Sequence, residues 1–299
     1  MTLVLTAHGP THNARGIAAM LAAMAGLIVN DAFIKMAAQS LPMGQAIFLR
    51  GLVTTFLCAA LVLAITGLGA PARLWTPPVL VRSLAEVAAT LLYLSALFNM
   101  PIADATAILQ FTPLAITAGA ALFLGAPVGW RRWLATLAGL AGVLLIVRPG
   151  GAGFNAYALV ALAAVVFVAA RDLITRRLRQ EVTALAIATS SSVAVALASL
   201  GFALFEPWRG PSAFEAGMLV CAGAALAAGQ LFIVVAMRTG EIAVVAPFRY
   251  SIILWAVLAG FLVWGEVPDA VSWAGIAIVS AAGLYTFLRE QQLARAGRT

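Results

Sequence analysis

Charged residues are scarce in this chain: they make up 10% of its 299 residues, whereas hydrophobic residues make up 63%. The mean hydropathy is +1.03, and a soluble domain of this length has no core large enough for so many apolar side chains. The apolar residues come in blocks of about 20, the length that a helix needs to cross roughly 30 Å of hydrocarbon. Strands of a membrane β-barrel alternate in segments of about 10 residues instead. The sequence therefore predicts an all-α integral membrane protein.

Cysteine and histidine are also scarce, with two of each. Cys58 and Cys221 lie in different apolar blocks, and two isolated cysteines predict neither a disulfide nor a metal site. The chain lacks a nucleotide-binding P-loop, so ATP does not drive it directly. It also lacks the HExxH and GxSxG motifs of common hydrolases and the acidic rings or filter repeats of ion channels. We expect no metal, no cofactor and no enzymatic activity.

The net charge of +7 comes from 18 basic residues against 11 acidic ones. These charges lie mostly in short loops between apolar blocks, so they predict membrane topology rather than binding to nucleic acid. One side of the membrane collects Arg15, Arg73, Arg131, Arg132, Arg176, Arg177, Arg179, Arg238, Arg289, Arg295 and Arg298. The other side collects only Lys35, Arg148 and Arg209. Because basic loops stay in the cytoplasm, we expect a multi-pass protein of the bacterial inner membrane with both termini cytoplasmic.

Ten apolar blocks are long enough to be spanning helices. Their connections are short, and several contain helix-ending prolines. The expected ranges are 16–38, 43–66, 78–98, 102–124, 131–148, 154–177, 182–205, 213–237, 242–264 and 271–288.

The segment Arg148 to Gly153, which reads RPGGAG, divides these spans into two sets of five. A shift of 140 or 141 positions places Asp31 on Asp172, Lys35 on Arg176, Gly125 on Gly265 and Trp133 on Trp273. Because five is odd, the two halves cross the membrane in opposite senses, as in the inverted repeats of secondary transporters. We expect a tail at 1–14, repeats at 15–148 and 154–289, a linker at 149–153 and a second cytoplasmic tail at 290–299.

A few ionisable side chains lie inside the apolar spans, where each needs a partner or a water-filled cavity. At 1.5 Å per residue, Asp31 and Arg50 each lie about 10 Å from the outer ends of their helices. Glu86 and Arg249 lie about 10 Å from the inner ends. The depths predict an outer pair, Asp31 with Arg50, and an inner pair, Glu86 with Arg249. Asp172 is the repeat partner of Asp31 near the inner face.

A structural role for these charges is an equal alternative. Arg82 has the spacing to pair with Glu86 along one helix, and Asp31 has the same spacing to Lys35. In that case the arginines lock helices together or fix the topology.

Uncharged polar and aromatic side chains near the middle of the spans are candidate cavity residues, because a small metabolite needs hydrogen-bond partners and aromatic faces. These residues are Asn30, Tyr93, Gln110, Thr112, Gln230, Tyr250 and Trp255. Pro113 and Pro247 interrupt the fourth and ninth spans and are candidate hinges or helix breaks.

Several short motifs resemble the EamA-type members of the drug/metabolite transporter superfamily. Gly265-Glu266 followed by Trp273 and Gly275 is similar to the end of the second EamA unit, and Gly125 and Trp133 take the same places in the first. Ala126 stands where the family often has glutamate. Arg50, in FLRGLV, is similar to the arginine common in the second helix, and Pro113 to the proline of the fourth.

The overall pattern is most similar to amino-acid and metabolite exporters of the YddG type. This resemblance implies ten helices in two tandem domains. It also implies a central cavity lined by the first, third, fourth, sixth, eighth and ninth helices, and export of amino acids or related small metabolites from the inner membrane.

We therefore expect alternating-access export of a small-molecule substrate by a monomer or homodimer in the lipid bilayer, without nucleic acid. A drug or sugar-phosphate carrier of the same superfamily and an intramembrane lipid-modifying enzyme are the alternatives. Proton coupling and facilitated diffusion are equally compatible with the sequence.

Overall fold

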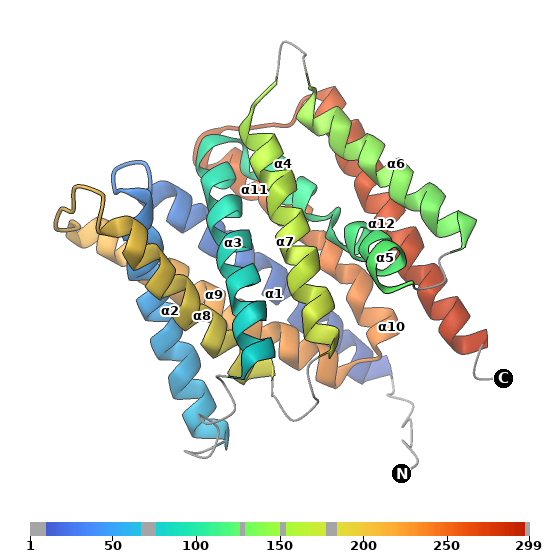
Figure 1. Cartoon of the computed structure of the whole chain (residues 1–299), viewed down its shortest axis with the longest axis horizontal. Coiled ribbons are helices and arrows are strands. Elements are labelled where there is room, and N and C mark those ends of the chain that lie inside the picture. The colour runs from blue at the N-terminus through green and yellow to red at the C-terminus, as the bar shows by residue number, and fades with distance from the viewer. Residues whose placement is uncertain (1–9, 67–75, 126–128, 150–153, 178–183, 297–299) are drawn as a thin grey trace.

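The computed structural model describes residues 10–66, 76–125, 129–149, 154–177 and 184–296, and every regular element in these ranges is a helix (Figure 1). The first half contains α1 (Pro10–Ala37), α2 (Met43–Thr66), α3 (Pro77–Asn99), α4 (Ile102–Leu109), α5 (Thr112–Leu124) and α6 (Trp130–Val147). The second half contains α7 (Tyr157–Arg177), α8 (Ala184–Ala203), α9 (Ala213–Thr239), α10 (Ile242–Val245), the 3-10 helix η3 (Ala246–Ser251), α11 (Ile252–Trp264) and α12 (Ala270–Ala296). Residues 1–9 of the expected tail, 150–153 of the expected linker and Ala126 lie outside the described ranges.

The membrane crossings follow the hydropathy pattern. Within the described residues, nine helical segments are long and apolar enough to span a bilayer. The tenth crossing is α8, whose described apolar part, Thr189–Ala203, is shorter. The prediction of an all-α membrane protein with ten spanning helices is confirmed. Two boundaries differ most from the expected ones: α1 already begins at Pro10, and α12 continues through most of the expected C-terminal tail to Ala296.

The helices of the two halves pack against each other in a pattern with two-fold symmetry. The first helix of the first half, α1, packs on the third helix of the second half, α9, and correspondingly α3 packs on α7. The second helices pair as α2 with α8, the fourth as α4 with α11, and the fifth as α6 with α12. Exchanging the halves reproduces every one of these pairs, as the two inverted five-helix repeats of this fold require.

The fourth and ninth crossings are both interrupted, and at equivalent positions. The fourth breaks between α4 and α5, where Pro113 occupies the second position of α5. The ninth breaks at η3, which contains Pro247. Both following helices have 13 residues, begin 140 positions apart and end on a left-handed glycine, Gly125 with φ 63° and Gly265 with φ 68°. A side chain with a Cβ is strained at such φ values, so glycine is the natural residue at both ends.

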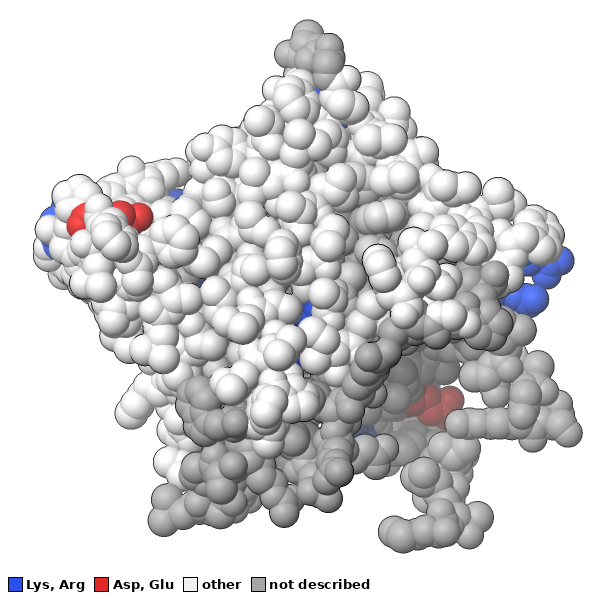
Figure 2. Space-filling view, in the orientation of Figure 1, with Lys and Arg blue, Asp and Glu red and all other residues white. Residues whose placement is uncertain are grey.

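The outer surface of the bundle is mostly apolar. In the view of Figure 2, uncharged atoms cover most of the described surface, and the larger groups of charged atoms lie at its margins. Large apolar side chains such as Phe56, Leu84, Phe123 and Leu262 are exposed on this surface. Such a surface suits hydrocarbon as its solvent. The start of α1 and the end of α12 lie at the same end of the bundle (Figure 1); we call it the terminal end and the opposite one the far end.

Helices α6 and α12 approach each other closely at two glycines. A Cβ added to Gly275 would lie 2.6 Å from the carbonyl oxygen of Gly142, and one added to Gly142 would lie 2.9 Å from the carbonyl oxygen of Gly275. Small residues permit this approach in lipid, where dispersion contacts between backbones replace the hydrophobic drive of water. At the far end, Arg148 pairs with Asp269 and donates a 3.3 Å hydrogen bond to Ser272 Oγ. The hydrogen bond from Arg148 lowers the pKa of Asp269 to about 2, so this pair stays charged at every physiological pH.

We predict that Gly275→Ala destabilises the protein. The added methyl group forces the two backbones apart, which costs about 1–3 kcal/mol, and this exceeds the gain in helix propensity of about 1 kcal/mol. Thermal unfolding of the detergent-solubilised protein would measure the loss. Gly217→Ala in α9 is the matched control, because a Cβ there meets nothing within 4 Å. A Gly275→Ala protein as stable as this control would contradict the prediction.

Candidate functional site

A first polar cluster, which we call the Asp31 cluster, joins α1, α2 and α3 toward the far end. It consists of Asn30, Asp31, Arg50 and Tyr93. The Tyr93 hydroxyl donates to Asp31 Oδ2 at 2.7 Å, and the Asn30 amide donates to Asp31 Oδ1 at 2.8 Å. Arg50 Nη1 donates to the carbonyl oxygen of Asn30's side chain at 3.2 Å. The expected proximity of Asp31 and Arg50 is present, but Asn30 lies between them and no direct salt bridge forms among the described contacts.

Lys35 closes the far end one turn beyond this cluster. Its ammonium donates to the carbonyl oxygen of Met100 at 2.7 Å, pairs with Glu266 at 3.6 Å and lies 4.7 Å from the centre of the Trp264 ring. Glu266 Oε2 also accepts a 3.4 Å hydrogen bond from the backbone N–H of Ile102. The alternative pairing of Lys35 with Asp31 is therefore wrong. Lys35 instead ties α1 to the α3–α4 connection and to the end of α11.

A second polar cluster, the Glu86 cluster, joins α3, α7 and α8 toward the terminal end. Glu86 pairs with Arg171 at 2.9 Å and with Arg82 at 3.1 Å, and Arg171 also pairs with Asp172 at 2.9 Å. Arg82 donates to Thr175 Oγ1 at 3.1 Å and hydrogen-bonds to Ser191. The alternative pairing of Arg82 with Glu86 is confirmed. Asp172, the repeat partner of Asp31, belongs to this cluster.

The predicted pair of Glu86 with Arg249 is wrong. Both residues lie near the terminal end, but α3 packs on α7, so Arg171 rather than Arg249 faces Glu86. Sequence reasoning missed Arg171. The signal was present, since Arg171 is an arginine within an apolar span and directly precedes Asp172.

Arg249 belongs to η3 and is exposed to solvent. It has no salt bridge within 4 Å in the described part of the chain, although its charge interacts with those of Asp172 and Arg171 on α7. A buried charge without a partner is costly in a membrane, whereas access to water reduces that cost. Arg249 thus lies beside the Glu86 cluster with part of its side chain exposed.

Three buried donors without a hydrogen-bond partner in the structure follow Arg249 along the same crossing. They are Tyr250 Oη, Ser251 Oγ and Trp255 Nε1. A buried donor without a partner costs about 1–3 kcal/mol, so such a group commonly marks a place where water or a ligand binds. Three of them within two helical turns make η3 and the start of α11 the strongest candidate for a ligand contact.

The two glutamines lie apart from this group. Gln110 sits at the break between α4 and α5, where its backbone N–H donates to Thr106 and Ala107. The Gln230 side chain faces α2, where its carbonyl oxygen lies 3.8 Å from Cys58 Sγ. These positions do not show whether either side chain contacts a ligand. The role of Gln110 and Gln230 as cavity residues stays a prediction.

Solvent access differs between the two clusters. Asn30, Asp31 and Arg50 are 3%, 8% and 5% exposed. At the terminal end the Asp172 side chain is 34% exposed, and Arg249 is more exposed still. The charged groups of the Asp31 cluster are therefore buried, whereas Asp172 and Arg249 near the terminal end are more exposed.

Comparison with known proteins places this geometry in a family. The sequence profile of the EamA-like transporter family matches the chain twice, at residues 14–148 and 155–288. The pseudopaline exporter CntI of Pseudomonas aeruginosa is 30% identical over 260 residues, which cover 85% of this chain and 89% of the exporter. A riboflavin transporter of Rhizobium johnstonii is 32% identical over 68% of this chain and 67% of its own length.

More distant similarities agree with these. An S-adenosylmethionine uptake transporter of Rickettsia prowazekii is 26% identical over 64% of this chain and 65% of its own length. A solved crystal structure superposes with a TM-score of 0.64 at 22% identity and covers 92% of this chain and 98% of its own, which supports the fold alone. The family match extends over both halves, and the relatives that share it are transporters of small molecules. The chain belongs to the EamA-like transporter family.

Proposed function

We propose that this metabolite transporter exports amino acids or closely related zwitterions across the bacterial inner membrane by alternating access. The observation that carries the proposal is Arg249, a solvent-accessible guanidinium without a salt bridge in the described residues, beside the partly exposed carboxylate of Asp172. A guanidinium binds a carboxylate through two parallel hydrogen bonds. The Asp172 carboxylate offers a partner for the substrate ammonium group.

The unpartnered donors beyond Arg249 support a polar or aromatic substrate side chain. Tyr250, Ser251 and Trp255 bring two hydroxyls, an indole N–H and two aromatic rings to one stretch of the ninth crossing. A substrate that accepts hydrogen bonds from them removes the cost of leaving these donors unpaired.

The distribution of solvent access supports alternating access. The charged groups of the Asp31 cluster and Lys35 at the far end are buried, whereas Arg249 at the terminal end is exposed. Inverted repeats allow the opposite arrangement by exchange of the conformations of the two halves. The breaks at Pro113 and Pro247 are the proposed hinges.

The excess of arginine at the terminal end supports a cytoplasmic location of both termini. In this orientation the accessible side of Arg249 faces the cytoplasm, where an exporter loads its substrate. The proposed assembly is a monomer or a homodimer.

A carrier of organic phosphates from the same superfamily is the second candidate. Near the terminal end, three arginines (Arg82, Arg171 and Arg249) and two carboxylates (Glu86 and Asp172) leave one net positive charge. One uncompensated charge suits a zwitterion or a monoanion better than a doubly charged phosphate, which generally meets several basic groups.

Purified protein in liposomes would test the proposal. The measurement is counterflow of a panel of labelled amino acids, with riboflavin and a sugar phosphate as competing substrates. We expect flux of at least one amino acid above that of protein-free liposomes. Flux of the phosphate without flux of any amino acid would replace the proposal by the second candidate.

We predict that Arg249→Gln raises the KM for an amino-acid substrate about tenfold, which corresponds to the loss of a hydrogen bond between charged groups. The variant should also lose the preference of the wild type for the free acid over its methyl ester, because the ester carries no carboxylate charge. Arg238→Gln is the matched control, since Arg238 is another exposed arginine near the terminal end. An Arg249→Gln protein with unchanged KM and unchanged preference would show that Arg249 does not bind the carboxylate.

We predict that Asp31→Asn destabilises the protein by about 3 kcal/mol, because it leaves the buried Arg50 without its counter-charge. The double variant Asp31→Asn/Arg50→Gln should recover more than half of the loss. Thermal unfolding in detergent would measure both. Asp269→Asn, at an exposed ion pair, should leave the unfolding midpoint nearly unchanged. A double variant less stable than either single variant would refute the coupling of Asp31 with Arg50.

A further inference from the structure

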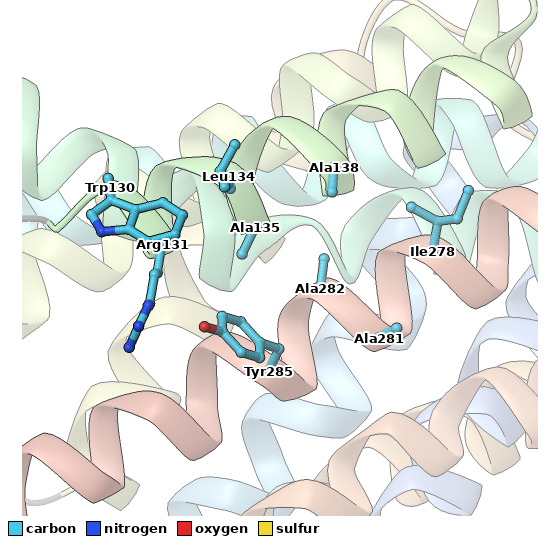
Figure 3. A pocket seen from close by; sticks show the side chains of 9 residues that line it. All are labelled: Trp130, Arg131, Leu134, Ala135, Ala138, Ile278, Ala281, Ala282 and Tyr285. Carbon is cyan, nitrogen blue, oxygen red and sulfur yellow. The ribbon is translucent and has the colours of Figure 1, made fainter.

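An apolar groove lies on the outer surface between α6 and α12, near the terminal end of the bundle. Its volume is about 470 Å³. Figure 3 shows Leu134, Ala138 and Ile278 along its length, and Arg131 and Tyr285 on facing helices at its terminal end. The groove is separate from the polar clusters of the proposed substrate path, because none of their residues lines it.

The packing of the two helices explains the groove. Their backbones touch at Gly142 and Gly275. Trp130 lies 12 residues from Gly142 and Tyr285 lies 10 residues from Gly275, which correspond to about 18 Å and 15 Å along the helices. Two helices that cross at one point diverge away from it, and alanines such as Ala135 and Ala282 do not fill the space between them.

The terminal end of the groove carries a positive charge that is available to a ligand. The Arg131 guanidinium lies 5.3 Å from the centre of the Trp130 ring, and no described acidic group pairs with it. Helix α6 contains two arginines and no acidic residue. The aromatic rings of Trp130 and Tyr285 suit the polar interface of a bilayer, where aromatic side chains gather.

We propose that this groove binds an anionic phospholipid, with one acyl chain along the apolar walls and the headgroup phosphate on Arg131. A guanidinium donates two hydrogen bonds to phosphate oxygens, and the Tyr285 hydroxyl is a further donor on the facing helix. A free phosphate would occupy only the charged end of the groove at Arg131. The apolar walls would remain uncovered, so a phosphate alone does not account for the whole groove. The site is placed in the cytoplasmic leaflet by the orientation proposed above.

A second copy of the chain is a poorer occupant. In a two-fold symmetric dimer the same surface patch meets itself. The arginines of α6 would then approach those of the partner copy, and like charges at close range in a membrane are costly. An anionic headgroup neutralises the same charge.

Native mass spectrometry of the full-length protein would test the proposal, with palmitoyl-oleoyl phosphatidylglycerol and the phosphatidylcholine of identical chains as probes. We expect the wild type to retain phosphatidylglycerol in preference to phosphatidylcholine. Arg131→Gln should weaken phosphatidylglycerol binding about fivefold, as expected for one basic residue near the membrane surface, and should leave phosphatidylcholine binding unchanged. Arg238→Gln, an exposed arginine on α9 outside the groove, is the matched charge control.

A second variant tests the acyl-chain part of the site. Ala138→Phe fills the groove and should reduce binding of both lipids, with the melting temperature of the lipid-free protein showing that the variant is folded. Equal effects of Arg131→Gln and Arg238→Gln would overturn the proposal. So would a protein dimer that Ala138→Phe abolishes, because a second copy would then occupy the groove. If Ala138→Phe does not fold, the two arginine variants still decide the outcome.

Discussion

A charge within a bilayer needs either a partner or water, and this constraint organises the interior of the protein. Toward the far end, Asp31 and Arg50 are almost fully buried and are joined through Asn30. Toward the terminal end, Glu86 binds two arginines, whereas Arg249 is exposed and has no salt bridge to any residue that the structure describes. Both clusters therefore meet this requirement with partners, and Arg249 is the exposed exception beside the second cluster. This difference separates a buried cluster from an exposed arginine within a scaffold of two equivalent halves.

Two buried arginines, Arg50 and Arg82, lie at equivalent helix contacts of the two halves. They come from helices that are not equivalent to each other. Arg50 and Ser191 are 141 positions apart, as are Arg82 and Gly223. The Arg50 backbone lies against Gly223 at the contact of α2 with α9, and Arg82 hydrogen-bonds to Ser191 at the equivalent contact of α3 with α8. Each contact contains one arginine, contributed by α2 in one case and by α3 in the other. The halves thus keep a common geometry while their charges come from different helices.

The fold follows from the sequence more directly than the site does. Block length and hydropathy determine the spanning helices, and Pro113 and Pro247 mark the two interrupted crossings, because these properties are local. Depth along a helix is also local, and it places Glu86 level with Arg249. Pairing further depends on which helix faces which, and the packing of α3 on α7 brings Arg171 to Glu86 instead. Spacing along the sequence does not tell which helices pack together or which way their side chains face. It predicts only pairs on one helix, such as Arg82 with Glu86.

Lys35 is the only lysine of the chain, and its single nitrogen contacts three separate parts of the structure. These are the carbonyl oxygen of Met100 after α3, the carboxylate of Glu266 after α11, and the ring of Trp264. Met100 belongs to the first half and Glu266 to the second, so one ammonium group fastens both halves together at the far end. Loss of this single nitrogen would therefore remove a hydrogen bond, an ion pair and a cation–π contact at once.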